Sequence, residues 1–114
     1  MLLSSIRRAQ AEHYTWGDAC DGWHLLNSQE LSVIEERMPP HTAECRHVHG
    51  KADQFFYILS GEAQMEIEDQ LVTLSARSGT FIEHGRPHKI SNRLVNGKDT
   101  AGEAKYKIAV QPRF

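Results

Sequence analysis

Residues 47–54 read HVHGKADQ and place two histidines, His47 and His49, one residue apart. Gln54 follows His49 after four intervening residues, and Gly61 follows Gln54 after six more. On a β-strand, side chains two positions apart point to the same face, so the two imidazoles are expected to point in one direction. Neutral imidazole binds zinc, copper, iron and nickel, so the two histidines are candidate metal ligands, with unrelated surface histidines as the alternative.

A second stretch, residues 85–92, reads GRPHKISN and supplies a third histidine, His88. Two residues separate Gly85 from His88, and three separate His88 from Asn92. The two stretches resemble the two motifs of the cupin superfamily, the first with a histidine pair, an acid and a glycine, the second with a glycine, a histidine and an asparagine. The resemblance implies an all-β fold, a cupin double-stranded β-helix (jelly-roll) barrel. It also implies one divalent metal held by His47, His49, Gln54 and His88.

The sequence departs from the cupin motifs at several positions. Gln54 occupies the position of the usual acid, and His41 occupies that of a glycine six residues before the first histidine. In the second motif Glu83 replaces the usual proline, and only three residues separate it from Gly79. Glycine and proline set backbone geometry in loops, so these changes concern the strand ends rather than the ligands.

The amide of Gln54 changes the electronic character that the resemblance implies for the site. With three neutral histidines and a neutral amide, a divalent metal keeps its two positive charges, whereas a glutamate would neutralise one of them. The higher charge lowers the pKa of bound water and strengthens the polarisation of a carbonyl. Non-haem iron oxygenases commonly use two histidines with a carboxylate. Gln54 therefore favours Lewis-acid chemistry, or binding alone, with Zn, Ni, Fe, Mn or Cu as the metal.

Short segments of strand-forming residues alternate with turn residues from Trp23 onward, which predicts an all-β sandwich or barrel. Residues 1–22 are expected to be an N-terminal lead, irregular or helical over 1–15, that packs on a cupin barrel of residues 23–114. The expected strands are 23–27, 31–38, 42–49, 54–60, 62–68, 70–74, 80–83, 87–91 and 104–111.

The composition is that of one globular domain, with 114 residues, 39% hydrophobic and 25% charged. A net charge of −2 and a pI near 6.4 provide no basic face for nucleic acid. No apolar run approaches the ~20 residues that a membrane span needs, and the N-terminus lacks the order of charged and apolar residues of a signal peptide. We expect a cytoplasmic protein with no membrane partner, in which Cys20 and Cys45 are free thiols.

The run 54–59 is apolar on both faces of a strand. If Gln54 points into the barrel, strand alternation points the other even-numbered side chains of the run inward as well. Phe55, Tyr57 and Leu59 then need a cover on the outside. Packing within the chain or a second copy can supply that cover, and the resemblance to small cupins favours a homodimer.

Further candidate residues flank the metal motifs. Glu83 and His84 precede the second motif, either as a general acid or base at the barrel mouth or as solvated loop residues. Arg86 is a candidate to hold an anionic group of a substrate, with a surface salt bridge as the alternative. Strand alternation would point Cys45 into the barrel, as a thiol near the metal or as packing. The aromatic segment 14–23 is expected to pack across a barrel opening or a neighbouring subunit, or to line a ligand pocket.

The function that these residues favour is that of a small metal-dependent cupin enzyme acting on a sugar-like or carbonyl-bearing small molecule. The ligand set resembles that of the cupin in pectin and alginate breakdown that converts unsaturated uronates into linear keto sugars. A dioxygenase on the same barrel is the alternative among enzymes. The alternative outside enzymes is a barrel that binds a small ligand or a metal without catalysis, because a fold does not by itself determine a function.

Overall fold

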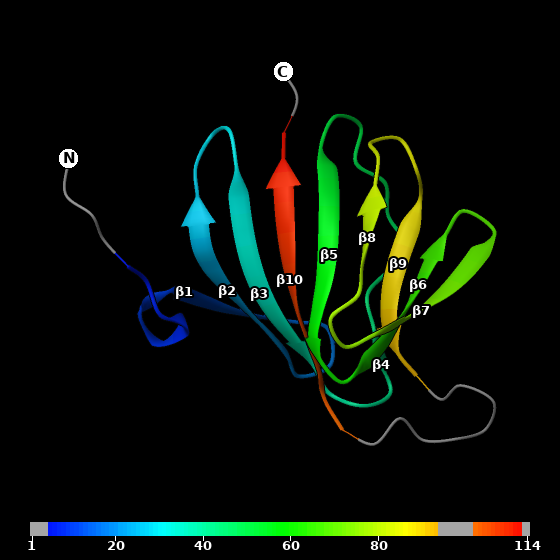
Figure 1. Cartoon of the computed structure of the whole chain (residues 1–114), viewed down its shortest axis with the longest axis horizontal. Helices are drawn as coiled ribbons and strands as arrows, with labels where there is room; N and C mark the ends of the chain where they lie inside the picture. The colour runs from blue at the N-terminus through cyan, green and yellow to red at the C-terminus, as the bar shows by residue number, and fades with distance from the viewer. Residues whose placement is uncertain (1–4, 94–101, 113–114) are drawn as a thin grey trace.

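The fold consists of ten β-strands and one 3₁₀ turn within residues 5–93 and 102–112, which a computed structural model of the chain describes (Figure 1). Nothing in these two ranges forms a helix with the length and hydropathy of a membrane span. The elements are η1 (Arg8–Gln10), β1 (Glu12–Trp16), β2 (Cys20–Asn27), β3 (Ser32–Met38), β4 (Thr42–Ala43), β5 (Asp53–Ser60), β6 (Glu62–Ile67), β7 (Gln70–Ser75), β8 (Gly79–Ile82), β9 (His88–Asn92) and β10 (Ala104–Gln111).

The strands form two antiparallel sheets. The larger sheet has the order β1-β2-β3-β10-β5-β8, and the smaller has the order β4-β9-β6-β7. This arrangement confirms the all-β jelly-roll fold that the sequence predicts. The sheets enclose one apolar core between them, made of Cys20, Met38, Phe56, Ile58, Ala63, Met65, Ile67, Leu74, Ile82, Ile90, Ala104, Tyr106 and Ile108.

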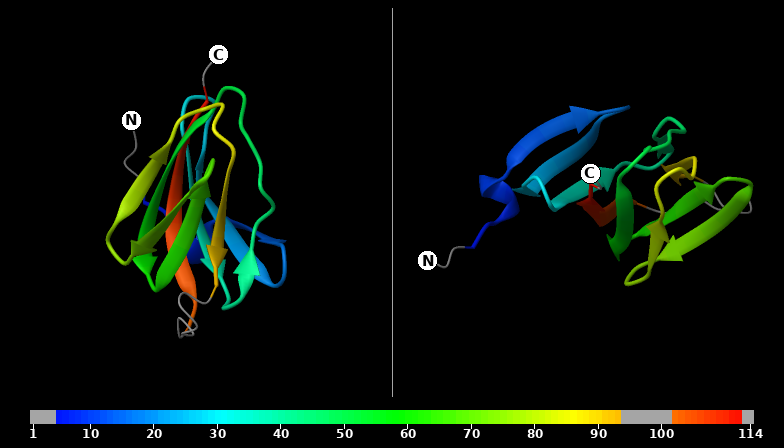
Figure 2. Two further views of the ribbon diagram at one scale, coloured as in Figure 1. Left: turned by 90° about the vertical axis from the view of Figure 1, so that its right-hand side faces the viewer. Right: turned by 90° about the horizontal axis from the view of Figure 1, so that it is seen from above.

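The N-terminal lead differs from the irregular or helical segment that the sequence predicts. Residues 12–16 form β1, which pairs antiparallel with β2. Tyr14 and Trp16 are half-buried on one face while their neighbours are exposed, which is the alternation of a strand. β2 begins at Cys20, so the boundary predicted between the lead and the barrel falls inside a strand. β1 and β2 continue the larger sheet beyond the smaller one (Figure 2).

The strand predicted over 42–49 is wrong beyond its first residues. Only Thr42–Ala43 form β4, and the chain then runs to β5 with a single isolated bridge at His47. Strand alternation does not apply to this segment, and Cys45 is exposed rather than directed into the barrel. Cys20 is buried, and both cysteines are free thiols, as predicted.

β5 shows the alternation that the sequence predicts. Gln54, Phe56 and Ile58 are buried, whereas Phe55 and Tyr57 are exposed. β5 lies between β10 and β8 and pairs with both. Its position inside the larger sheet holds the Gln54 side chain at the inner face, beside the apolar core.

The backbone has a positive φ, which favours glycine, at Gly61 and at His41. Gly61 has φ +78°, and a Cβ at this position would lie 2.3 Å from the carbonyl oxygen of Glu103, so no other residue fits. His41 stands where the cupin motif has a glycine, and it has φ 67°.

Arg77, in the turn between β7 and β8, has φ 68°. A residue with a Cβ in this conformation costs roughly 1–2 kcal/mol.

Arg77→Gly is expected to stabilise the protein by about 0.5–1 kcal/mol, because glycine adopts positive φ without the Cβ clash and this gain exceeds its larger loss of chain entropy. The Arg77 side chain is exposed, so its removal costs little packing. Thermal unfolding should show a rise in Tm of about 4 °C. Arg77→Ala, which keeps the Cβ, is the control, and an equal rise in both variants would show that the backbone conformation is not the cause.

Candidate metal site

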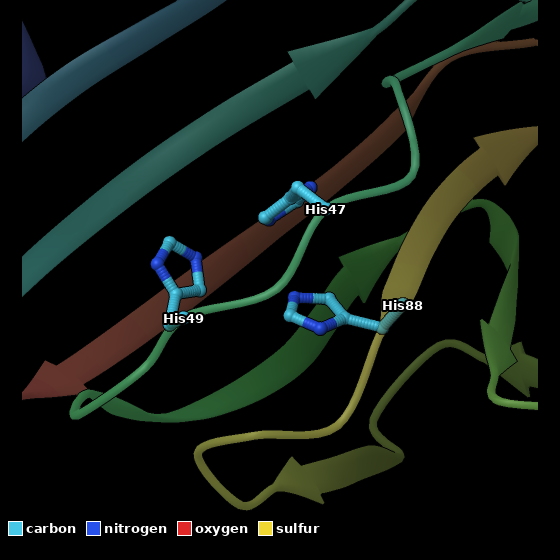
Figure 3. Close-up of side chains that lie close together, drawn as sticks. All are labelled: His47, His49 and His88. Carbon is cyan, nitrogen blue, oxygen red and sulfur yellow. The ribbon is translucent and has the colours of Figure 1, made fainter.

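His47, His49 and His88 form a cluster that has the composition of a metal site. Their ligand nitrogens all lie within 4.8 Å of one another. His47 and His49 come from the segment between β4 and β5, and His88 is the first residue of β9. Figure 3 shows the three rings grouped around a common space. The structure therefore brings the imidazoles of the two motifs together, and their role as metal ligands stays a prediction.

Two reciprocal backbone hydrogen bonds bring the motifs together. The His47 N–H donates to the His88 carbonyl oxygen at 3.0 Å, and the His88 N–H donates to the His47 carbonyl oxygen at 2.9 Å. The Gly85 N–H donates to the His49 carbonyl oxygen at 2.7 Å, with Gly85 at φ +82°. The imidazoles thus converge through a local bridge to β9 rather than through a continuous strand over residues 42–49.

Backbone carbonyl groups fix which nitrogen of each ring is available. Nδ1 of His47 lies 2.9 Å from the Cys45 carbonyl oxygen, and Nδ1 of His88 lies 2.9 Å from the Arg86 carbonyl oxygen. A carbonyl oxygen only accepts hydrogen bonds, so each Nδ1 carries the hydrogen and Nε2 keeps its lone pair in the neutral ring. Metal-ligating histidines regularly donate their other ring N–H in this way.

Gln54 and His49 supply polar atoms that fit a metal ion. Nε2 of the buried His88 lies 2.9 Å from Oε1 of Gln54, so two lone pairs face each other. A cation bound to both atoms would remove that repulsion. Nε2 of His49 is buried with no hydrogen-bond partner among the described residues. A buried polar atom of this kind is unfavourable until another group or an ion binds it.

The electrostatics of the cluster favour neutral rings. Burial lowers the pKa of His49 and of His88, and the charge of the neighbouring histidines lowers both further. The hydrogen bond to the Arg86 carbonyl opposes this effect in part at His88. Because an imidazole binds a metal only when it is neutral, the lowered pKa values favour metal over proton binding.

Glu44 is a residue of this site that sequence reasoning missed. Its carboxylate accepts a hydrogen bond from the Ile90 N–H at 3.0 Å and lies 3.9 Å from Nδ1 of His47. Burial raises the pKa of Glu44 to about 7, although His47 and the Ile90 hydrogen bond act in the opposite direction. A continuous strand over 42–49 would have directed this side chain away from the histidines, and the end of β4 at Ala43 allows it to turn inward.

The residues predicted as catalytic before the second motif lie outside the histidine cluster. Arg86 donates to a carboxylate oxygen of Glu68 at 3.1 Å, and both side chains are exposed. Oδ1 of Asp53 lies 2.9 Å from the backbone nitrogen of His84 and 2.8 Å from its Nδ1. Glu83 is exposed. A catalytic role for these three residues stays a prediction.

The comparison with known families agrees with this geometry. A family model described as a cupin domain matches residues 34–94, more than half of the chain. The chain belongs to the cupin family. The matched span contains both histidine motifs and Gln54. A search of curated proteins gives no match for this cupin.

Solved structures from several bacteria share the fold of this cupin. KdgF from Halomonas sp. superposes with a TM-score of 0.83 at 14% identity, covering 99% of this chain and 96% of that chain. A predicted oxalate decarboxylase from Thermotoga maritima gives a TM-score of 0.79 at 19% identity, with 96% and 100% covered. TT1209 from Thermus thermophilus gives 0.69 at 23% identity, with 80% and 81% covered. At these identities the likeness concerns the fold.

His88→Ala is expected to lower the metal content of the purified cupin from about one divalent ion per chain to near zero, because the substitution removes one imidazole and leaves the Gln54 oxygen without its neighbouring ligand. Elemental analysis after exchange into metal-free buffer measures the content. His13→Ala is the matched control, since His13 pairs with Asp21 away from the cluster, and it should keep the wild-type content. Equal metal in wild type and His88→Ala would contradict the site.

Proposed function

We propose that this cupin is an enzyme that uses a divalent transition metal as a Lewis acid on a small sugar-like or carbonyl-bearing substrate. The observation that carries the proposal is the position of Gln54, whose amide oxygen lies 2.9 Å from Nε2 of His88 where the cupin motif has an acid. The ion is Zn, Ni, Fe, Mn or Cu, all of which accept imidazole ligands or oxygen ligands. The residues that would hold it are His47, His49, Gln54 and His88.

A neutral set of ligands suits Lewis-acid chemistry. Three imidazoles and one amide leave both positive charges of a divalent ion uncompensated, and such an ion polarises a carbonyl or lowers the pKa of bound water. The chain supplies the orientation, because the carbonyl groups of Cys45 and Arg86 hold the rings of His47 and His88. It also supplies Glu44, a carboxyl group with a pKa of about 7 beside the cluster, in the range that suits proton transfer near neutral pH.

Unsaturated uronates are the first substrates to test. The ligand set resembles that of the cupin that converts these sugars into linear keto sugars, and the fold is similar to that of KdgF from Halomonas sp.. Conversion removes the conjugated double bond, so the loss of its ultraviolet absorbance follows the reaction. Activity that a chelator abolishes and that added metal restores would support the proposal, and no conversion by metal-loaded protein would exclude this substrate class.

Two other functions remain as alternatives. A dioxygenase on the same barrel would consume oxygen with its substrate, which an oxygen electrode measures. A non-catalytic barrel that binds a small ligand or stores metal is favoured by the loop before the second motif, where Arg86 contacts Glu68 and His84 contacts Asp53. These polar side chains bind to the protein itself, so they offer fewer groups to a substrate.

Gln54→Glu is expected to keep the metal and to weaken its Lewis acidity. A carboxylate donates more charge than an amide, so the net charge of the site falls by one unit and the pKa of metal-bound water rises by about one unit or more. Activity near neutral pH should fall although the site stays filled. A pH–rate profile with metal content measured on the same samples tests this. An unchanged rate and profile at full metal content would mean that Gln54 is not a ligand or that the metal is structural.

We further infer a homodimer formed through the outer face of the larger sheet. Phe55, Tyr57, Leu59 and Phe81 are 43%, 37%, 37% and 53% exposed on this face. A hollow of about 250 Å³ has Phe55 and Phe81 in its lining. Contiguous exposed apolar surface of this kind marks interaction sites. The residues that line the hollow are Leu31, Asp53, Gln54, Phe55, Phe81, Ala109 and Gln111.

Phe81→Glu is expected to convert the dimer to a monomer, since a charge in the centre of an apolar interface is desolvated without a partner. Light scattering should give about twice the 13.0 kDa chain mass for the wild type and about one chain mass for the variant. Leu71→Glu is the matched control, because Leu71 is 69% exposed on β7 of the smaller sheet, and it should stay dimeric. A wild-type mass near 13.0 kDa would reject the dimer.

A further inference from the structure

Glu36 is a buried carboxylate on the inner face of β3 that is not part of the histidine cluster. It is 8% exposed, and each of its oxygens accepts a hydrogen bond from a phenol. Tyr14 donates to Oε2 at 2.5 Å, and Tyr106 donates to Oε1 at 2.8 Å. A buried charge is strongly unfavourable unless it is hydrogen-bonded, so these two donors make the position possible. An apolar side chain would fill the same space without that cost, which points to a chemical role for the carboxylate.

The register of the larger sheet brings these three residues together. Tyr14 lies opposite Gly22, Gly22 lies opposite Glu36, and Glu36 lies opposite Tyr106. A Cβ at Gly22 would lie 2.1 Å from the Tyr14 ring. The glycine therefore allows the Tyr14 side chain to cross β2 and reach the carboxylate.

The Tyr14–Glu36–Tyr106 group lies on the same inner face as the residues beside the metal cluster. The Phe56 ring contacts one residue of each group. Its centroid lies 5.9 Å from that of Tyr106 and 6.3 Å from that of His88. Tyr14 belongs to the part of the larger sheet that continues beyond the smaller sheet (Figure 2), and it is half-buried there. Nearby, the ring of His24 lies 4.9 Å from that of Tyr14, and its buried Nδ1 has no hydrogen-bond partner among the described residues. The surroundings of Glu36 therefore include a second buried polar group, the His24 imidazole.

We propose that Glu36 is the general base of this cupin, which removes a proton from the carbon next to the carbonyl group of the substrate, and that Tyr14 and Tyr106 are positioning residues. The proposal rests on the proposed function, in which a metal held by the histidine cluster would polarise the carbonyl group. The C–H electron pair becomes the C=C bond of an enolate, the carbonyl π pair moves onto oxygen, and the proton binds to the Glu36 carboxylate. Return of a proton to the same carbon reverses the step, so no oxidant or other reactant is required.

The surroundings of Glu36 raise the pKa of its carboxyl group. Burial raises the pKa of Glu36, and the hydrogen bonds from the two phenols lower it in part, with the histidine charges acting in the same direction as the phenols. A raised pKa makes a carboxylate a stronger proton acceptor. The titratable groups that face Glu36 are Tyr14 on β1, Cys20 and His24 on β2, Tyr106 on β10, and Glu44 and His47 between β4 and β5.

Hydrogen–deuterium exchange at carbon tests the proposal without knowledge of the natural substrate. Metal-loaded protein is incubated in D₂O with dihydroxyacetone, glyceraldehyde or pyruvate, and proton NMR follows the loss of the C–H signal. We expect exchange in the wild type and a loss of about 100-fold or more in Glu36→Gln, at unchanged metal content. Glu35→Gln is the matched control, since it makes the same change at the next residue, which instead pairs with Arg8, and it should exchange at the wild-type rate.

A second readout separates a positioning role from a structural one. Tyr106→Phe removes a hydrogen bond that lowers the pKa of Glu36, so that pKa rises and the low-pH limb of the exchange rate moves to higher pH. Carbon-13 NMR of the metal-free protein, labelled at its glutamate carboxyl groups, should show the same upward displacement directly. A phenol that only stabilises the sheet would lower Tm without moving either curve.

Each outcome decides a separate point. Exchange at the wild-type rate in Glu36→Gln would overturn Glu36 as the base while leaving the Lewis-acid function intact. Absence of exchange in the metal-loaded wild type with all three probes would overturn both. If Glu36→Gln does not fold, the NMR titration of the wild type still decides, because a Glu36 carboxyl pKa at or below the ordinary glutamate value would overturn the proposal.

Discussion

The site depends on the pair of backbone hydrogen bonds between His47 and His88. The segment that carries the first motif leaves regular structure at Ala43, and this bridge attaches it again to β9. On each side of the bridge, the histidine donates from Nδ1 to the carbonyl oxygen of the residue two positions before it. The same local arrangement therefore leaves Nε2 of both rings with a lone pair that can bind a metal. The position of Gln54 on β5 then adds an oxygen to a set of nitrogens that the backbone has already aligned.

The resemblance of the two motifs to those of cupins predicted the histidine cluster and the jelly-roll barrel, and the apolar run 54–59 predicted the alternation of β5. The orientation of Cys45 and Glu44 was not predictable in that way, because alternation assumes a strand and β4 ends at Ala43. The motif asparagine, Asn92, has a structural role that spacing alone does not reveal. Its Nδ2 donates to the carbonyl oxygens of Met38 and Gly102 and thereby ties the smaller sheet to the larger one.

The burial of Glu36 was also beyond the reach of sequence reasoning. Glu35 and Glu36 stand side by side in the sequence, and a pair of acids in a strand is ordinarily expected to lie near solvent. One of them is buried because phenols arrive from β1 and from β10, at separations of 22 and 70 residues. Only the completed sheet brings these donors to the carboxylate. Hydrogen bonds from residues so distant in the sequence leave no periodic pattern in the residues next to Glu36.

The place of β10 in the larger sheet has a consequence for how the chain folds during synthesis. β10 lies between β3 and β5, although it follows both in the sequence. Until β10 has emerged from the ribosome, β3 and β5 each present an unpaired edge, and such edges promote aggregation. The contacts that β10 makes are distant in sequence, which slows folding. Cellular yield of this protein should therefore depend on chaperones that protect nascent chains and on the speed of translation before β10.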